Sequence, residues 1–103
     1  MIYLIDNLNI PLKSIRKCAG TGLIVDIKGK GEPKGKDFCI ALRADIDALP
    51  MKENNPDLSY RSVNDAAHMC GHDGHSTCLL GGAANILDNI EKIPKNKTVR
   101  LLF

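Results

Sequence analysis

The chain has 103 residues, which suits one small domain or a piece of a larger one. Its composition, 44% hydrophobic and 25% charged, is that of a folded protein and excludes a largely disordered chain. Fourteen basic and twelve acidic residues leave a net charge of +2, too small to indicate nucleic-acid or membrane partners. There is no apolar run of the roughly 20 residues that span a bilayer and no signal-peptide pattern, so we expect a cytoplasmic protein.

The first half of the chain predicts one helix and two strands. Apolar residues at helical spacing predict a short helix over residues 2–8, which begins without a cap. A turn signal at 20–22 leads into a β-branched strand at 23–27. The apolar run at 38–47 predicts a second strand, buried on both faces. Only the Gly- and Lys-rich loop at 29–36 separates these strands, so we expect them to pair as an antiparallel hairpin.

The second half predicts a long loop, a helix and a last strand. Residues 50–67 are rich in Pro, Asn and Ser, and long irregular loops of this kind are usually functional. A helix is predicted over 74–93, because six apolar residues form one stripe: Leu79, Leu80, Ala83, Ala84, Leu87 and Ile90. Gly81-Gly82 indicates either close packing of this helix on the sheet, which the unbroken stripe favours, or a break between two short helices. A last strand is predicted at 98–103, and the whole pattern is that of an α/β fold.

All three histidines of the chain lie in one stretch, "HMCGHDGH" at residues 68–75. Cys70 and His72 offer a thiolate and an imidazole, both good ligands for Zn²⁺, and the glycine between them lets the backbone bend. His75 follows His72 by three residues, so the two could share one face of a helical turn. His68 lies on the other side of Cys70. This stretch predicts a metal site.

Two ligands do not complete such a site, because tetrahedral zinc takes about four, or three and a water. His68, His75 or Asp45 would have to supply the others. Asp73 fits the helix N-cap, or it could orient a ligating histidine. A redox thiol or a cysteine nucleophile with a histidine base are the alternatives; Cys70 lacks a C-x-x-C partner, which disfavours the redox thiol.

Two carboxylates, Asp45 and Asp47, end the strand predicted at 38–47. Alternation along an extended chain places both on one face, where a metal or a ligating histidine would satisfy them. The spacing is equally consistent with a pair between one carboxylate and Arg43, or with a turn cap before Pro50. From spacing alone both interpretations stay open.

These motifs together resemble the N-terminal part of the catalytic domain of the M20 metallopeptidases. The matching stretches are "GTGLIVDIKG", "IALRADIDALPMKE", "HMCGHDGH" followed by "LLGGAANIL", and "TVRLLF", in that order. The resemblance is strongest to the amidohydrolase branch that contains hippurate hydrolases, auxin-conjugate hydrolases and N-acyl-diaminopimelate deacetylases. It covers the chain from about residue 20 to its end, and Met69 replaces the alanine usual in the metal motif.

The resemblance implies a fragment of an α/β/α sandwich that carries two divalent metal ions per complete site, Zn²⁺ or Mn²⁺. The implied reaction cleaves the amide bond of a small-molecule N-acyl amino acid. Cys70 and His72 match family ligands, and the catalytic aspartate matches Asp45, with Asp47 as the second choice. His75 and His68 belong to the same motif as weaker metal candidates. No nucleic-acid or membrane partner is implied, and the full-length protein could be a homodimer.

The resemblance also predicts that residues 1–103 are a partial catalytic domain, truncated at both ends. In relatives the strand matching "TVRLLF" continues into "QPAEE", which holds the glutamate general base and a glutamate ligand. The lid or dimerisation domain and an N-terminal "HxHPEL"-like motif are likewise expected elsewhere. We therefore expect a fragment that is inactive alone. The alternative is a free-standing module that binds metal, or binds a partner through the sheet edge at 98–103, without catalysis.

Overall fold

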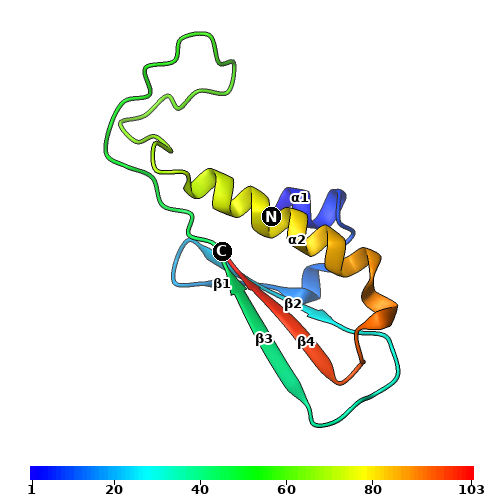
Figure 1. Cartoon of the computed structure of the whole chain (residues 1–103). Coiled ribbons are helices and arrows are strands. Elements are labelled where there is room, and N and C mark those ends of the chain that lie inside the picture. Colours follow the sequence, from blue (N-terminus) through cyan, green and yellow to red (C-terminus); the bar gives the residue numbers. More distant parts are fainter.

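The computed structural model describes residues 1–103 and contains one four-stranded sheet (Figure 1). In chain order the strands are β1 (Ile15–Cys18), β2 (Gly22–Lys28), β3 (Phe38–Arg43) and β4 (Lys97–Leu102). Their order in the sheet is β1-β2-β4-β3. β2 runs antiparallel to β1 and β4, whereas β3 and β4 are parallel. The two edges of the sheet are therefore β1 and β3.

Two α-helices, α1 (Ile2–Asp6) and α2 (His72–Asp88), lie over the same face of this sheet (Figure 1). Short 3-10 turns, η1 (Leu12–Ser14) and η2 (Ile90–Lys92), precede β1 and follow α2. The fold is a mixed α/β arrangement, as the sequence predicts. These residues supply one helical layer of the predicted sandwich. Neither helix is both long enough and apolar enough to cross a membrane.

The core lies between α2 and the two central strands. Val25 of β2, Leu101 of β4 and Ala83 of α2 have no exposed surface. Nine buried residues form the whole cluster: Leu4, Ile10, Ile15, Val25, Ile27, Ala44, Leu79, Ala83 and Leu101. Leu80, Leu87 and Ile90 of the predicted stripe pack against its margin. The helical periodicity thus identified the face of α2 that contacts the sheet.

The predicted antiparallel hairpin is wrong, because β4 lies between β2 and β3. Residues 29–37 connect β2 to β3 past the starting end of β4, instead of turning directly back (Figure 1). The loop is held to the chain around β4 by backbone hydrogen bonds from Lys95 N to Gly31 O and from Gly29 N to Lys97 O. β3 and β4 are joined through α2, which is the crossover that a parallel pair requires.

The strand predicted at 38–47 is shorter and more exposed than expected. β3 ends at Arg43, and all of its residues are exposed because it forms an edge of the sheet. The sheet edge expected at residues 98–103 is wrong, because β4 lies inside the sheet and the edges are β1 and β3. Sequence analysis did not predict β1, because Arg16 and Lys17 interrupt any apolar alternation there.

α2 begins earlier and ends earlier than the predicted helix at 74–93. Its N-cap is Gly71, in a left-handed conformation at φ +84°, so Asp73 lies in the first turn and not at the cap. The helix is continuous through Gly81-Gly82, as the favoured interpretation predicts, and the alternative of a break does not occur. The close packing on the sheet expected at these glycines is wrong, because a Cβ atom at either one would meet nothing within 4 Å.

Candidate metal centre

The charged motifs meet where the parallel strands end and α2 begins. The chain leaves β3 at Arg43, and Asp45 then contacts His75 and Ser76 in the first turns of α2, which starts at His72. In α/β folds the carboxyl ends of parallel strands face the amino ends of the following helices, so side chains from both elements converge there. The long connection between these two motifs, about residues 48–71, extends away from the body of the molecule (Figure 1).

Asp45, His72 and His75 bring one ligand atom each to within 4.8 Å of one another. Nδ1 of His75 lies 2.9 Å from Oδ1 of Asp45, and Nε2 of His72 lies 3.9 Å from Oδ2 of the same carboxylate. The two imidazole rings stack with centroids 5.4 Å apart, as expected for positions three residues apart on a helix. One carboxylate and two imidazoles therefore converge at this point.

Asp47 contacts the same site through His72. Its Oδ1 atom lies 2.8 Å from Nδ1 of His72. This contact fixes the ring and leaves Nε2 facing Asp45, which is the arrangement by which carboxylates orient metal-ligating histidines. The side chain of Asp45 is 32% exposed, whereas that of Asp47 is 72% exposed. The structure thus gives the two carboxylates different surroundings.

The site favours the charged form of Asp45. The hydrogen bond from His75 is the largest cause that lowers the pKa of Asp45 below its usual value, and a backbone hydrogen bond and the two nearby histidines add to it. Ser76 donates a hydrogen bond to the Asp45 carbonyl at 3.3 Å, which fixes the backbone there. Nη1 of Arg43 lies 3.9 Å from the Asp45 carboxylate. A carboxylate that stays ionised is available as a metal ligand.

This donor set fits a divalent cation of borderline softness. Imidazole nitrogen and carboxylate oxygen are ligands of Zn²⁺ and Mn²⁺. Ligands about 2 Å from one ion lie at most about 4 Å apart, so the 3.9 Å between His72 Nε2 and Asp45 Oδ2 suits a shared ion. His75 has its Nε2 free as a further donor, because its Nδ1 contacts Asp45.

The structure does not bring every predicted ligand into this group. Cys70 is exposed and lies outside the three residues whose ligand atoms converge. Gly71, with its positive φ, sets the direction of the chain between Cys70 and His72. His68 lies in a different hollow, which Glu53, Tyr60 and other residues of the long loop line. The contact between His75 and Asp45 makes His75 a fuller member of the site than its sequence position suggested.

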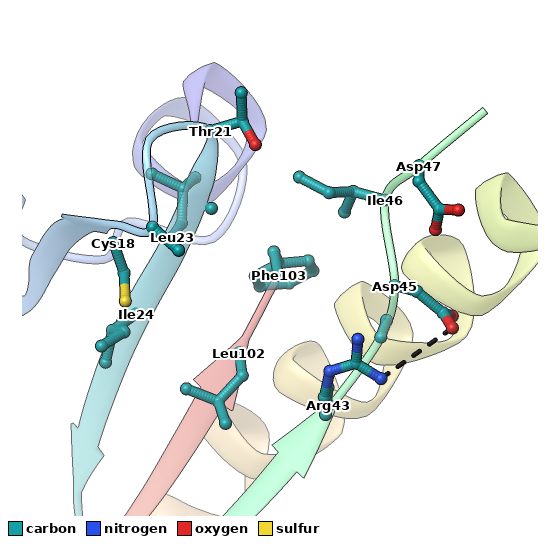
Figure 2. A pocket seen from close by; sticks show the side chains of 13 residues that line it. Cys18, Thr21, Leu23, Ile24, Arg43, Asp45, Ile46, Asp47, Leu102 and Phe103 are labelled. Carbon is teal, nitrogen blue, oxygen red and sulfur yellow. Dashed lines mark ion pairs between the residues drawn. The ribbon is translucent and has the colours of Figure 1, made fainter.

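An open cavity of about 370 Å³ borders the two aspartates (Figure 2). Leu23 and Ile24 at the start of β2 form one wall, and the chain from Arg43 to Asp47 forms the other. Leu102 and Phe103 lie between these walls. The lining is mostly apolar, with Arg43, Asp45 and Asp47 along one side. Sequence analysis did not find this cavity, because its residues come from three separate parts of the chain.

Comparison with known proteins finds one matching family model and several similar proteins. The family model described as peptidase family M20/M25/M40 matches residues 41–103. Thermostable carboxypeptidase 1 of Saccharolobus solfataricus is 45% identical over 87 residues, which cover 82% of this chain and 21% of that protein. An uncharacterized hydrolase of Staphylococcus aureus strain USA300 is 46% identical over 81 residues, which cover 74% of this chain and 18% of that protein. The chain thus spans about a fifth of the length of these curated relatives.

The fold agrees with a solved structure from the same group. The crystal structure of the Bacillus subtilis YXEP protein, described as a dinuclear metal-binding peptidase from the M20 family, superposes with a TM-score of 0.67. The two sequences are 35% identical, and the match covers 87% of this chain and 24% of that one. The matched residues contain both motifs of the site, because the family model begins at residue 41.

Proposed function

Because this chain belongs to peptidase family M20/M25/M40, we propose that it is the metal-binding part of a hydrolase that cleaves the amide bond of N-acyl amino acids. The observation that carries this proposal is the convergence of Asp45, His72 and His75, with Asp47 holding the His72 ring. The dinuclear metal-binding peptidase from Bacillus subtilis, whose fold this chain shares, supports it.

In this proposal the ions are Zn²⁺ or Mn²⁺, two in a complete site. His72 and Cys70 are metal ligands, and His75 is a further ligand because it already contacts Asp45. Asp45 is the catalytic aspartate, and Asp47 is the second choice. His68 is the weakest ligand candidate, since it lies in a separate hollow. A bound divalent cation would supply Lewis acidity, which lowers the pKa of water and polarises the amide carbonyl.

The cavity beside the aspartates supports a substrate that is partly apolar. Its walls are mostly hydrophobic, and they lie next to the carboxylates of Asp45 and Asp47. An acyl group could occupy the apolar part while its amide reaches the metal centre. Pockets of this kind combine apolar walls with a few convergent polar groups. Arg43 lies at the rim and also contacts Asp45, so it fixes the carboxylate beside the substrate.

We further propose that residues 1–103 alone do not turn over substrate. The reaction needs a general base in addition to the metal. The three glutamates of the chain are Glu32, Glu53 and Glu91. None belongs to the convergent group, and Glu53 accepts a hydrogen bond from Ser62 in the long loop. Loss of a general base typically costs about 10²–10⁴-fold in rate.

Metal binding tests the first part of the proposal. Calorimetric titration of the 103-residue chain with Zn²⁺ and with Mn²⁺ should show binding that His72→Ala and His75→Ala each weaken strongly. His68→Ala is the matched control, because it removes the same side chain from outside the group, and it should leave the affinity unchanged. Equal affinity in all four proteins would show that these histidines do not form the site.

Hydrolysis tests the second part. Residues 1–103 loaded with Zn²⁺ or Mn²⁺ should not cleave N-acetyl- or N-benzoyl-amino acids, whereas a longer protein that contains them should. Turnover by the 103-residue chain that is lost in Cys70→Ala would overturn the proposed inactivity. The alternative is a binding module without catalysis. It predicts no hydrolysis by the longer protein either.

A further inference from the structure

The long connection between β3 and α2 contains two paired legs, which we call the ribbon and define as residues 49–67. Its outgoing leg begins at Leu49 and its returning leg ends at Ala67 (Figure 1). These two residues form an antiparallel bridge, in which each backbone N–H donates to the carbonyl oxygen of the other at 3.0 Å. Ala67 is also buried. The loop predicted as irregular at residues 50–67 is therefore closed at its base, as antiparallel strands are.

The side chain of Glu53 closes the ribbon a second time, nearer to its tip. Its Oε2 atom accepts a hydrogen bond from the backbone N–H of Ser62 at 2.6 Å, and both residues are half-buried. The Ser62 hydroxyl donates to the Ala66 carbonyl at 2.5 Å, and Asn64 Oδ1 accepts from the Ala66 N–H at 3.0 Å. The returning leg thus contains a turn with its own hydrogen bonds, and Glu53 joins that turn to the outgoing leg.

Each leg of the ribbon leads directly into one half of the candidate metal centre. Asp47 stands two residues before Leu49, and His72 stands five residues after Ala67. The side chains of Asp47 and His72 meet at 2.8 Å. Three contacts therefore join the same two legs in order from the tip to the site: Glu53 to Ser62, Leu49 to Ala67, and Asp47 to His72. All three lie within residues 47–72, so none of them depends on a free surface.

We propose that Glu53 is a positioning residue of this metal centre: it closes the ribbon and so holds Asp47 beside His72 before a metal ion binds. The inference rests on the proposed function, because it takes the convergence of Asp45, His72 and His75 as the metal site. Glu53 makes no hydrogen bond to any of these three, so it acts through the ribbon. A site whose ligand-bearing segments are already in place loses less conformational entropy when an ion binds.

A carboxylate suits this role better than a neutral acceptor. Hydrogen bonds to an ionised acceptor are shorter and about twice as strong as those between neutral groups, and the 2.6 Å between Glu53 and Ser62 agrees with this. The neighbouring ion pair between Lys52 and Asp65 is different, because its atoms are 3.8 Å apart, beyond hydrogen-bonding distance. We therefore assign the closure of the ribbon to Glu53 and not to this ion pair.

Amide hydrogen exchange of the metal-free 103-residue chain, followed by NMR, tests the closure. Glu53→Ala should speed exchange of the Leu49 and Ala67 amides at least about tenfold, because their hydrogen bonds cross the base of the ribbon and break when the legs separate. Val25 and Leu101, which pair in the sheet, should keep their exchange rates and so show that the fold is retained. Unchanged exchange at Leu49 and Ala67 would overturn the proposal.

Two further variants separate the hydrogen bond from the charge. Glu53→Gln keeps an acceptor oxygen for the Ser62 N–H, so exchange at the ribbon base should lie between that of the unchanged chain and that of Glu53→Ala. Asp65→Ala is the matched control, because it removes a carboxylate that makes no hydrogen bond from the same ribbon, and it should leave exchange unchanged. An effect of Asp65→Ala as large as that of Glu53→Ala would contradict a specific role of Glu53.

Calorimetric titration with Zn²⁺ tests the positioning. Glu53→Ala should bind Zn²⁺ about tenfold more weakly than the unchanged chain, whereas Asp65→Ala should bind it equally well. Because Glu53 acts by holding Asp47, its substitution should weaken binding less in an Asp47→Ala background than in the unchanged chain. An equal loss in both backgrounds, or no loss in Glu53→Ala, would exclude the positioning role alone. If the proposed function itself fails, the unchanged chain binds no Zn²⁺, and the inference that rests on it fails too.

Discussion

Nδ1 of His72 lies 2.8 Å from Oδ1 of Asp47, although 25 positions separate the two residues in the chain. The contact joins the first turn of α2 to the segment that follows β3. It also decides which nitrogen of the ring is free to bind a metal ion, because Nδ1 is occupied. A carboxylate in this position acts on metal affinity through the histidine that it holds.

Substitution of Asp47 by alanine should therefore lower metal affinity about 10- to 100-fold, because the His72 ring loses the partner that orients it. Asp47→Asn keeps an acceptor oxygen and should have a smaller effect. Titration calorimetry with Zn²⁺ measures both. Asp57→Ala removes an exposed carboxylate of the long loop and is the control. If Asp47→Ala binds Zn²⁺ as tightly as Asp57→Ala does, the ring does not depend on Asp47.

Cys70 should contribute to a second metal ion and not to the first. Asp45, His72 and His75 converge without it, so Cys70→Ala should bind one equivalent of Zn²⁺ with unchanged affinity. Binding of a second equivalent should weaken, because the proposed thiolate ligand is gone. Loss of the first equivalent in Cys70→Ala would instead show that the turn at Gly71 rearranges to bring the thiolate to His72.

The sequence allowed the helix α2, three of the four strands and the histidine pair to be predicted, because each depends on local spacing. The apolar stripe of α2 follows from helical periodicity, and so does the shared face of His72 and His75. The order of the strands could not be predicted in this way. β4 enters the sheet between β2 and β3, and this depends on a crossover that local patterns do not encode.

In the candidate site, too, local spacing predicted some features, whereas others depend on the tertiary fold. The pairing of Asp47 with His72 requires two motifs to approach in space, so spacing alone left the role of both aspartates open. The position of Cys70 depends on the left-handed conformation of Gly71, which redirects the chain just before α2. The sequence indicated that a glycine there would permit a bend, but it did not give the direction of the bend.

The cross-strand pair between Asp26 and Arg100 should make stability depend on pH. Arg100 Nε and Nη2 donate to the Asp26 carboxylate at 2.6 and 2.9 Å, and Arg16 adds a contact at 3.1 Å. The hydrogen bond from Arg100 is the largest cause that lowers the pKa of Asp26. A carboxyl group with a lowered pKa in the folded state stabilises the fold above its unfolded pKa, and this contribution is lost as pH falls through the folded value.

Asp26→Asn should therefore destabilise the chain at neutral pH by about 1 kcal/mol, after allowance for the partial exposure of the arginines. The difference from the unchanged chain should shrink as the pH falls below the usual carboxyl pKa of 3.8. Urea unfolding followed by circular dichroism between pH 7 and pH 3 measures it. A difference that stays constant over this range would mean that the effect of the substitution is not electrostatic.

Leu101→Ala should be among the most damaging substitutions in the chain. Leu101 of β4 is fully buried in the core that contains Val25 and Ala83, and removal of a buried leucine side chain typically costs about 2–5 kcal/mol. Only 11 of the 103 residues are buried, so a loss of this size is a large part of the free energy of unfolding of these residues. Thermal unfolding should show a much lower midpoint or no cooperative transition. Val63→Ala, at a 96%-exposed position, should leave the midpoint unchanged.

Substitution by alanine should change the unfolding midpoint in opposite directions at Gly29 and at Gly82. A Cβ atom at Gly29 would overlap the backbone carbonyl oxygens of Ile93 and Pro94, where the loop after β2 passes under the end of η2. Backbone atoms cannot move aside without breaking the hydrogen bonds around them, so Gly29→Ala should lower the unfolding midpoint. A Cβ atom at Gly82 would meet nothing within 4 Å. Since alanine is favoured over glycine inside a helix by about 1 kcal/mol, Gly82→Ala should raise the midpoint.

These two variants carry the same added methyl group, so the comparison between them separates helix propensity from close packing. If Gly82→Ala lowers the unfolding midpoint as Gly29→Ala does, then a surface contacts Gly82 in solution that the single chain does not show. Gly82 lines the hollow between α2 and β3, next to the uncovered side chain of Leu42.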